Sequence, residues 1–318
     1  MSAVPESPVP RAALVLVGPT ASGKTAAAHA IARARGWAVL SADAMQVYRG
    51  LDIGTAKPTP AERAGLICGG LDYCEADRTF SVGEYLRAVA AEWPRLAAAP
   101  AVLVAGGTGL YIQALMEGLD AAPSRPDLRA EAEALLEQRG LAALQAAVRE
   151  RAPALWAALR DPANPRRLVR AYERARLGDR PRPPRAAASR PWLVGLRVAP
   201  AELEERIRAR VRAMYAAGLL DEAATLRARG PTLSPTAAQA IGYREAFDVL
   251  DGRCSAAEAM ERTVIRTRQY AKRQMTWFRG RAAVAWIEAG GGRSFADIMA
   301  KICEYGDRHG GIALHGLR

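Results

Sequence analysis

The sequence "GPTASGKT", residues 18–25, follows the apolar run "AALVLV" at 12–17 and leads into the alanine-rich stretch "KTAAAHAIARARG". Gly18 is followed, after four residues, by Gly23, Lys24 and Thr25, which is the spacing of the Walker A pattern. In that pattern a turn between a strand and a helix binds a run of phosphates through backbone N–H groups and the positive end of the helix dipole. The sequence therefore predicts a phosphate site at the first strand–helix turn of a parallel sheet.

Strand and helix signals keep alternating after this loop. "WAVLSAD" at 37–43 and "PAVLVAGGTG" at 100–109 are apolar strands, and "SVGEYLRAVAAEWPRLA" at 81–97 is an amphipathic helix with a serine N-cap. Such alternation indicates a doubly wound parallel sheet, whose ligands bind at the carboxyl ends of the strands. The phosphate loop, Asp43 and Gly106 all fall at such ends, so we expect them to share one crevice.

The pattern of apolar residues changes after residue 118. Helical spacing without strand signals runs to the linker "GDRPRPPRAAASRP", and "WLVGLRVAP" then returns to a strand pattern. This order predicts an all-helical insertion inside an α/β domain. The expected division is a flexible N-terminus at 1–11, a core at 12–118 and 190–290 with a helical C-terminal part, a helical insertion at 119–189 and a disordered tail at 305–318.

Composition narrows the class of protein. The net charge of +12 and a pI near 10 favour a polyanionic partner, although an arginine-rich composition also follows from biased codon usage. The four cysteines lack metal-site spacing, so neither a zinc site nor a disulfide framework is expected. No apolar stretch is long enough for a membrane span. We expect a monomeric, cytoplasmic protein without a secretory signal.

An ordinary NTPase places an acid at the end of a second apolar strand, where it helps to hold Mg²⁺. Here the strand "AVLVAGGTG" ends in glycines and Thr108 instead. The loop alone therefore leaves open a small-nucleotide kinase, an adenylate prenyltransferase and an RNA-remodelling NTPase that binds ATP. The last of these requires an acid that the sequence does not provide.

The segment "SADAMQVYRGLDIGTAKP" at 41–58 places polar residues beside the phosphate loop. A carboxylate such as Asp43 can accept a proton from an incoming nucleophile there. An amide such as that of Gln46 matches the neighbouring donor and acceptor of an adenine edge. The alternative is a solvated loop without a catalytic role.

Four segments together carry a resemblance: "GPTASGKT", "SADAMQVYRGLDIGTAKP", "GGTGLY" and "GYREAFDVLDG…TRQYAKRQMTWFRG". In this order they resemble the tRNA dimethylallyltransferase family over residues 12–288. The resemblance implies a P-loop NTPase-like core with a tRNA-binding helical insertion. It implies transfer of a dimethylallyl group from dimethylallyl diphosphate, with Mg²⁺, to the exocyclic amine of the adenosine 3′ of the anticodon, in tRNAs that read codons beginning with U. Diphosphate is then a leaving group, and no Walker B acid is needed.

The resemblance also implies roles for single residues. Asp43 would accept the proton of the amine, Lys24 and Arg210 would stabilise the diphosphate, and Thr108 would line the tunnel where adenine meets the prenyl chain. Spacing leaves Arg206 or Arg208 as alternatives to Arg210, and the glycines around Thr108 could form a tight turn only. The implied diphosphate-binding residues are Gly18, Pro19, Thr20, Ala21, Ser22, Gly23, Lys24 and Thr25, with the Thr25 hydroxyl also a Mg²⁺ ligand.

Basic residues interleaved with aromatic ones suit RNA binding by phosphate neutralisation and stacking. A core-facing pair at Trp277 and Phe278, or a merely solvated basic face, is the alternative. Ala44 stands where the family more often has serine. The expected contacts with the tRNA anticodon stem-loop are Asp43, Ala44, Met45, Gln46, Arg166, Arg167, Leu168, Val169, Arg170, Gln239, Ala240, Ile241, Gly242, Tyr243, Arg244, Lys272, Arg273, Gln274, Trp277 and Arg279.

Overall fold

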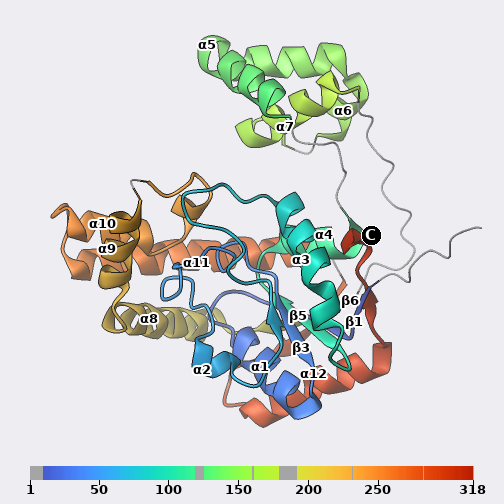
Figure 1. The fold of residues 1–318 in the computed structure, drawn as a ribbon, viewed down its shortest axis with the longest axis vertical. Helices are drawn as coiled ribbons and strands as arrows, with labels where there is room; N and C mark the ends of the chain where they lie inside the picture. The colour runs from blue at the N-terminus through green and yellow to red at the C-terminus, as the bar shows by residue number, and fades with distance from the viewer. Residues whose placement is uncertain are drawn as a thin grey trace, which may run out of the picture. The chain divides into compact units, whose positions relative to one another are not determined.

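The computed structural model describes residues 10–118, 125–159, 161–178, 192–230, 232–281 and 283–317 (Figure 1). The chain forms two compact units: Met1–Gly118 with Arg190–Arg318, and Leu119–Ser189. The sequence places its α/β core and its helical insertion at the same boundaries. We call them the core unit and the helical unit.

A six-stranded parallel sheet organises the core unit. The strand order is β4-β3-β5-β2-β6-β7, and β2 lies between β5 and β6. Every pairing in this sheet is parallel, as the strand–helix alternation predicts. The strands are β2 (Leu14–Val17), β3 (Ala38–Ser41), β4 (Cys68–Gly69), β5 (Val102–Gly106), β6 (Trp192–Arg197) and β7 (Ala283–Glu288).

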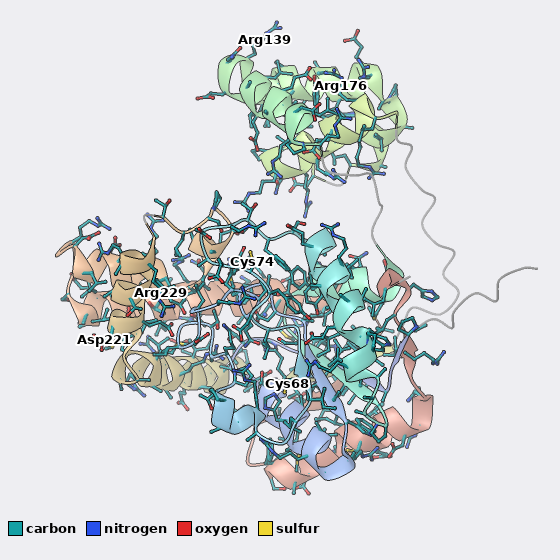
Figure 2. All side chains as sticks on the ribbon, in the orientation of Figure 1. Cys68, Cys74, Arg139, Arg176, Asp221 and Arg229 are labelled. Atoms are coloured by element: carbon teal, nitrogen blue, oxygen red, sulfur yellow. The ribbon has the colours of Figure 1, made fainter. Side chains whose placement is uncertain are left out.

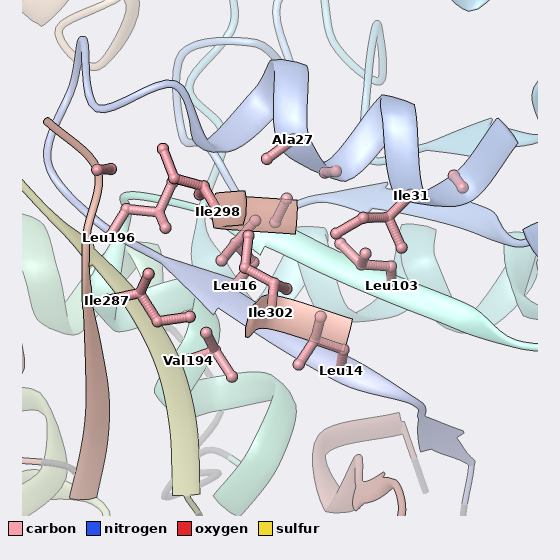
Figure 3. Packing of buried hydrophobic residues seen from close by; sticks show 14 of the residues in the cluster. Leu14, Leu16, Ala27, Ile31, Leu103, Val194, Leu196, Ile287, Ile298 and Ile302 are labelled. Carbon is pink, nitrogen blue, oxygen red and sulfur yellow. The ribbon is translucent and has the colours of Figure 1, made fainter. Parts of the chain in front are cut away.

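The main core lies between this sheet and two helices that are far apart in the sequence. Helix α1 (Lys24–Arg35) contributes Ala27 and Ile31, and helix α12 (Phe295–His309) contributes Ile298 and Ile302, all packed with Leu16 of β2 (Figure 3). Both faces of β2 are buried along its whole length. The strand that leads into the phosphate loop is therefore rigidly held.

Further helices of the core unit position the site. Helix α3 (Val82–Leu96) begins at a capping box formed by Ser81 and Glu84, which confirms the predicted N-cap. Its Tyr85 ring stacks on that of Tyr111, 4.1 Å away. The other helices are α2 (Pro60–Arg63), α4 (Gly109–Glu117), α8 (Pro200–Ala216), α9 (Leu219–Arg229), α10 (Tyr243–Leu250), α11 (Ala256–Arg281) and the short 3-10 helix η1 (Ala237–Gln239).

The helical unit has its own core. Helix α5 (Pro126–Arg151) is interrupted at Gly140, where φ is 78° and the helix cannot continue. It packs against α6 (Pro153–Ala158) and α7 (Pro165–Arg176). Basic side chains such as Arg139 project from this unit (Figure 2). The buried residues include Ala132, Leu144, Val148, Leu168, Val169 and Tyr172.

The expectation of a disordered tail at 305–318 is wrong. Helix α12 runs to His309, β8 (Ile312–Ala313) pairs antiparallel with β1 (Arg11–Ala12), and a 3-10 turn η2 (His315–Leu317) follows. Leu314 is fully buried and donates its backbone N–H to Pro10 at 2.7 Å. Of the predicted flexible start, residues 1–9 lie outside the described residues, whereas Arg11 belongs to β1.

The four cysteines carry free thiols, among them Cys68 and Cys74 in the core unit (Figure 2). Among the described helices, none combines the length and the apolar character needed to cross a bilayer.

Candidate active site

The phosphate loop connects the buried strand β2 with α1. Gly23, at the N-terminus of α1, has a φ of 89°, and Ala21 has a φ of 63°. A non-glycine residue with positive φ is uncommon and is typical of functional loops. Backbone N–H groups in such turns form concavities that bind anions, and the N-terminus of α1 adds its dipole. The backbone is thus already shaped for an anion.

The polar side chains of the loop are arranged around this concavity. The Lys24 ammonium group donates to the backbone oxygen of Pro19 at 3.1 Å. The hydroxyl oxygen of Ser22 is buried and has no hydrogen-bond partner among the described residues. Since buried polar atoms are nearly always paired, this orphan hydroxyl fits a site that is completed by an oxygen-rich ligand.

Asp43 follows β3 and belongs to the same site as the phosphate loop. One of its carboxylate oxygens accepts the backbone N–H of Met45 at 2.9 Å, which fixes the side chain. Burial lowers the pKa of Lys24 to about 8, the negative charge of Asp43 opposes that shift, and the positive charge of Arg210 adds to it. The three charged groups that the sequence assigns to the site are therefore electrostatic neighbours.

The three arginines of α8 that the sequence leaves as candidates, Arg206, Arg208 and Arg210, differ in their surroundings. Burial lowers the pKa of Arg210, and the charge of Asp43 opposes this effect. Arg206 and Arg208 instead form ion pairs with glutamates on α8 and α11. Of these three, Arg210 is the one whose charge acts on Lys24 and is itself affected by Asp43.

Thr108 joins the ends of two neighbouring strands, β3 and β5. Its hydroxyl oxygen accepts the backbone N–H of Ala44 at 2.9 Å, and its own N–H donates to Ala42 at 3.2 Å. A Cβ atom on Gly106 would lie 2.2 Å from the Ala42 oxygen, so this close approach requires glycine. The "GGTG" segment is thus a tight turn that also holds the loop of Asp43.

Tyr270 of α11 also belongs to this site, although it is not among the residues expected from the sequence. Burial raises the pKa of its hydroxyl, the Asp43 carboxylate raises it further, and hydrogen bonds with Thr108 and Gln274 act in the opposite direction. The phenol therefore stays protonated at neutral pH. Its position four residues before Gln274 is the one signal that could have found it, once the face of α11 is known.

Gln46 lies beside the site, but its amide is engaged within the protein. Its oxygen accepts from the Ser41 hydroxyl at 2.8 Å, and its nitrogen donates to the backbone oxygen of Ala56 at 3.2 Å. The side chain is buried. In this structure it holds the segment 41–58 in shape and does not present its amide to an adenine.

The residues expected to contact tRNA fall into two groups. Arg166, Arg167, Gln239, Arg244, Lys272, Arg273 and Arg279 are exposed, and Asp43, Ala44, Met45, Arg170, Ile241 and Trp277 are partly exposed. The second group is buried in this structure: the side chains of Gln46, Leu168, Val169, Ala240, Tyr243 and Gln274, and the backbone of Gly242. Leu168 and Val169 lie in the core of the helical unit.

Tyr243 and Phe278 are aromatic residues that stand next to basic residues in the sequence and are buried in the structure. The Tyr243 hydroxyl donates to Glu222 at 2.6 Å and accepts the Gly54 N–H at 3.2 Å, and its ring is fully buried. Phe278 is fully buried as well, as in the core-facing alternative. Basic neighbours in sequence therefore do not reveal which side of a helix faces solvent.

Within the part of the chain that the structure describes, no group of three or more His, Cys, Asp or Glu side chains is placed to hold a metal ion. Thr25, in the first turn of α1, offers a hydroxyl beside the phosphate loop. A metal at this site would need oxygen atoms from the bound ligand to complete its coordination.

Comparison of the sequence with known proteins identifies family models and relatives that together match most of the chain. Residues 46–281 match the family model "IPP transferase", and residues 11–78 match the model "Isopentenyl transferase". The chain is 44% identical to the tRNA dimethylallyltransferase of Deinococcus radiodurans over 274 residues, which cover 83% of this chain and 89% of the relative. The corresponding protein of Kineococcus radiotolerans is 40% identical over 304 residues, 92% of this chain and 95% of the relative.

Solved structures lead to the same family. The tRNA isopentenylpyrophosphate transferase of Bacillus halodurans superposes with a TM-score of 0.66 at 34% identity, over 93% of this chain and 94% of that one. A eukaryotic dimethylallyltransferase acting on tRNA shares the fold, with a TM-score of 0.68 at 21% identity over 87% of this chain and 73% of that one. With a family model that spans most of its length and relatives near 40% identity, the chain belongs to the IPP transferase family, whose members include the tRNA dimethylallyltransferases.

Proposed function

We propose that this protein transfers a dimethylallyl group from dimethylallyl diphosphate to the exocyclic amine of the adenosine 3′ of the anticodon, in tRNAs that read codons beginning with U. The names of its relatives support tRNA as the substrate and a dimethylallyl group as the cargo. The position of the target adenosine and the set of tRNAs that are modified rest on the family resemblance.

The phosphate loop would hold the diphosphate of the donor. The N–H groups of the loop and the Lys24 ammonium group would bind the anion, the unpaired Ser22 hydroxyl could gain a partner from it, and Arg210 would add a second positive charge. Mg²⁺ would be held by the Thr25 hydroxyl together with diphosphate oxygens, and it would neutralise charge on the leaving group. The absence of an acid at the end of β5 fits a loop that releases diphosphate and cleaves no phosphoryl bond.

Asp43 would act as the general base. The C–O bond to diphosphate breaks as the bond from the adenine nitrogen to the prenyl carbon forms, and one proton of the amine passes to the carboxylate. Because one carboxylate oxygen already accepts the Met45 N–H, the other remains for the amine. An adenine amine is a weak nucleophile, so base assistance of about 10²–10⁴-fold is expected.

Two surfaces would bind the tRNA. In the helical unit, Arg166 and Arg167 are exposed at the start of α7. In the core unit, Arg244, Lys272 and Arg273 are exposed on α10 and α11. Contacts of this kind neutralise phosphates and give affinity that falls with salt. The target base would be extruded from the anticodon loop to reach Asp43, at a cost of a few kcal/mol.

The observation that carries this proposal is the electrostatic grouping of Asp43 with Lys24 and Arg210. A carboxylate beside two cations that hold a leaving group suits the removal of a proton during alkyl transfer. The names of the relatives favour prenyl transfer over a kinase reaction.

The test compares acceptors under one set of conditions. The protein is incubated with Mg²⁺ and dimethylallyl diphosphate that carries a label in the prenyl group, together with unmodified tRNA, an anticodon stem-loop without the target adenosine, or AMP. Label in the tRNA alone is expected. Label in AMP would favour the adenylate prenyltransferase, and tRNA-stimulated ATP hydrolysis without label transfer would favour the RNA-remodelling NTPase.

A further inference from the structure

One face of α11 packs against the segment that carries Thr108. Tyr270, Gln274 and Trp277 follow one another at intervals of four and three residues, so they lie on the same side of the helix. A Cβ atom on Gly107 would lie 2.0 Å from the side-chain nitrogen of Gln274, and one on Gly109 would lie 2.3 Å from the ring of Trp277. Helix α11 is therefore in close contact with the backbone on both sides of Thr108.

Gln274 connects this segment to the phosphate loop. Its side-chain oxygen accepts the backbone N–H of Thr20 at 2.8 Å, and its side-chain nitrogen donates to the backbone oxygen of Gly107 at 3.0 Å. The residue is 4% exposed. One amide group thus satisfies two buried backbone groups on loops that are far apart in the sequence, and neither group can turn to water if the amide is removed.

In the proposed reaction, one of these two loops would bind the leaving group and the other would position the base. Thr20 belongs to the loop that would bind the diphosphate. Gly107 precedes Thr108, whose hydroxyl accepts the N–H of Ala44, the neighbour of the proposed base Asp43. The distance between leaving group and base therefore depends on a bridge through Gln274. Alkyl transfer requires the reacting atoms to be held about 3–3.5 Å apart and in line, and a misplacement of about 1 Å can cost about 100-fold in rate.

The bridge requires glutamine chemistry. A glutamate could accept from Thr20 but, as a carboxylate, could not donate to Gly107, and it would add negative charge beside the diphosphate. A methionine has a similar volume but neither hydrogen-bonding group. Direct contact of this amide with RNA, the role expected from the sequence, would require breaking both hydrogen bonds.

We propose that Gln274 is a positioning residue, which sets the diphosphate loop against the loop of Thr108 and Asp43, and that α11 serves the reaction from its buried face as well as the tRNA from its exposed face. This inference rests on the proposed function for the identity of the reaction. The bridge itself rests on the two hydrogen bonds and on the glycines at 107 and 109.

The test uses the full-length protein with Gln274→Met and Gln274→Glu, and Gln269→Met as the matched control, because Gln269 is an exposed glutamine on the same helix. For Gln274→Met we expect kcat to fall about 10–100-fold and the KM for dimethylallyl diphosphate to rise, with the KM for tRNA within about twofold of wild type. Gln269→Met is expected to match wild type in kcat and in the KM for dimethylallyl diphosphate.

Two readouts do not depend on turnover. Binding of inorganic pyrophosphate with Mg²⁺, measured by calorimetry, should weaken in Gln274→Met. Hydrogen exchange at the Thr20 amide should speed up in Gln274→Met but stay slow in Gln274→Glu, which keeps the acceptor while losing the donor to Gly107. If Gln274→Met fails to fold, Gln274→Glu still carries the test, because it should bind tRNA normally while its turnover falls.

The proposal is overturned if both variants turn over as wild type, or if they change only the KM for tRNA and its salt dependence, as a lost RNA contact would. Failure of the proposed function gives a different result: wild-type protein would then transfer no label to tRNA, while the effect of Gln274→Met on pyrophosphate binding and on the Thr20 amide could still be measured.

Discussion

The carboxylate of Asp43 counteracts the burial that lowers the pKa of Lys24 to about 8. The two residues are 19 positions apart in the sequence and meet because β2 and β3 both end at the same edge of the sheet, on either side of β5. An acid is thereby held next to a cation that faces a phosphate loop. This relationship makes the charge state of the site sensitive to pH and to substitution of either residue.

Binding of an organic diphosphate should weaken above pH 8. Below that value Lys24 is protonated and can pair with the anion, and as the pH rises past the pKa its charge is lost. Between pH 7 and 9 we expect the Kd for a non-reactive dimethylallyl diphosphate analogue to rise about tenfold. Lys24→Arg should bind with little pH dependence over this range, because a guanidinium stays charged. Calorimetry across the range checks both, and a flat wild-type profile would refute the role of Lys24.

Replacing the proposed base should separate chemistry from binding. Asp43→Asn should lower kcat about 10²–10⁴-fold without weakening tRNA binding. Loss of the negative charge should also shift the pH midpoint of diphosphate binding downward, since Asp43 raises the pKa of Lys24. Asp77→Asn, at an exposed position, is the control. Single-turnover kinetics at wild-type rates in Asp43→Asn would remove this residue from the mechanism.

The Thr108 hydroxyl should matter for stability as well as for turnover. Thr108→Val leaves the Ala44 N–H without its acceptor, and we expect a loss of about 1–3 kcal/mol in the free energy of unfolding. Turnover should fall because the loop of Asp43 loses its anchor. Thr108→Ser keeps the hydroxyl and should restore most of both. Denaturant unfolding and kcat are measured in parallel, and equal behaviour of the valine and serine variants would contradict the assignment.

The close contact between Gly107 and Gln274 offers an independent test of the packing around the site. Gly107→Ala introduces a methyl group 2.0 Å from the Gln274 amide nitrogen, so we expect a destabilisation of about 1–3 kcal/mol and reduced turnover. Gly230→Ala is the control, since a Cβ at Gly230 meets nothing within 4 Å. Thermal unfolding of the two variants gives the comparison. Similar stabilities would mean that the loop adapts without cost.

The exposed basic face of α11 should bind RNA phosphates. Lys272→Ala is preferred over Arg273→Ala, because the Arg273 guanidinium lies over the ring of Tyr270, 5.8 Å from its centre, and its removal would disturb the site. For Lys272→Ala the slope of log K against log salt for tRNA binding should fall by about one. Lys301→Ala on α12, also exposed, should leave the slope unchanged. An unaltered slope in Lys272→Ala would exclude a phosphate contact there.

Much of this architecture could be predicted from local patterns. Apolar runs with glycine or serine signals at their ends identify β2, β5 and α3, because burial and capping act on neighbouring residues. The ordered C-terminus could not be predicted, since Ile312 and Leu314 gain their partners from β1 and Pro10, about 300 residues away.

Parts of the candidate site could not be predicted from the sequence either, because they also depend on contacts between distant residues. Helix α11 is polar on more than one side, so its sequence does not reveal that Gln274 is buried and Tyr270 partly buried, while Lys272 and Arg273 are exposed. The choice of Arg210 over Arg206 and Arg208 likewise required knowledge of which glutamates lie nearby. Motif spacing locates the reacting groups, whereas tertiary contacts decide which neighbours position them.

The fate of the two halves of the donor tests the central claim most directly. Dimethylallyl diphosphate is labelled with ¹⁴C in the prenyl group and with ³²P in the diphosphate, and is incubated with Mg²⁺, tRNA and either wild-type protein or Asp43→Asn. We predict that ¹⁴C enters the tRNA, that an equal amount of ³²P is released as intact pyrophosphate, and that Asp43→Asn slows both together. Release of inorganic phosphate, or transfer of ³²P to the RNA, would contradict a phosphate loop that holds a leaving group.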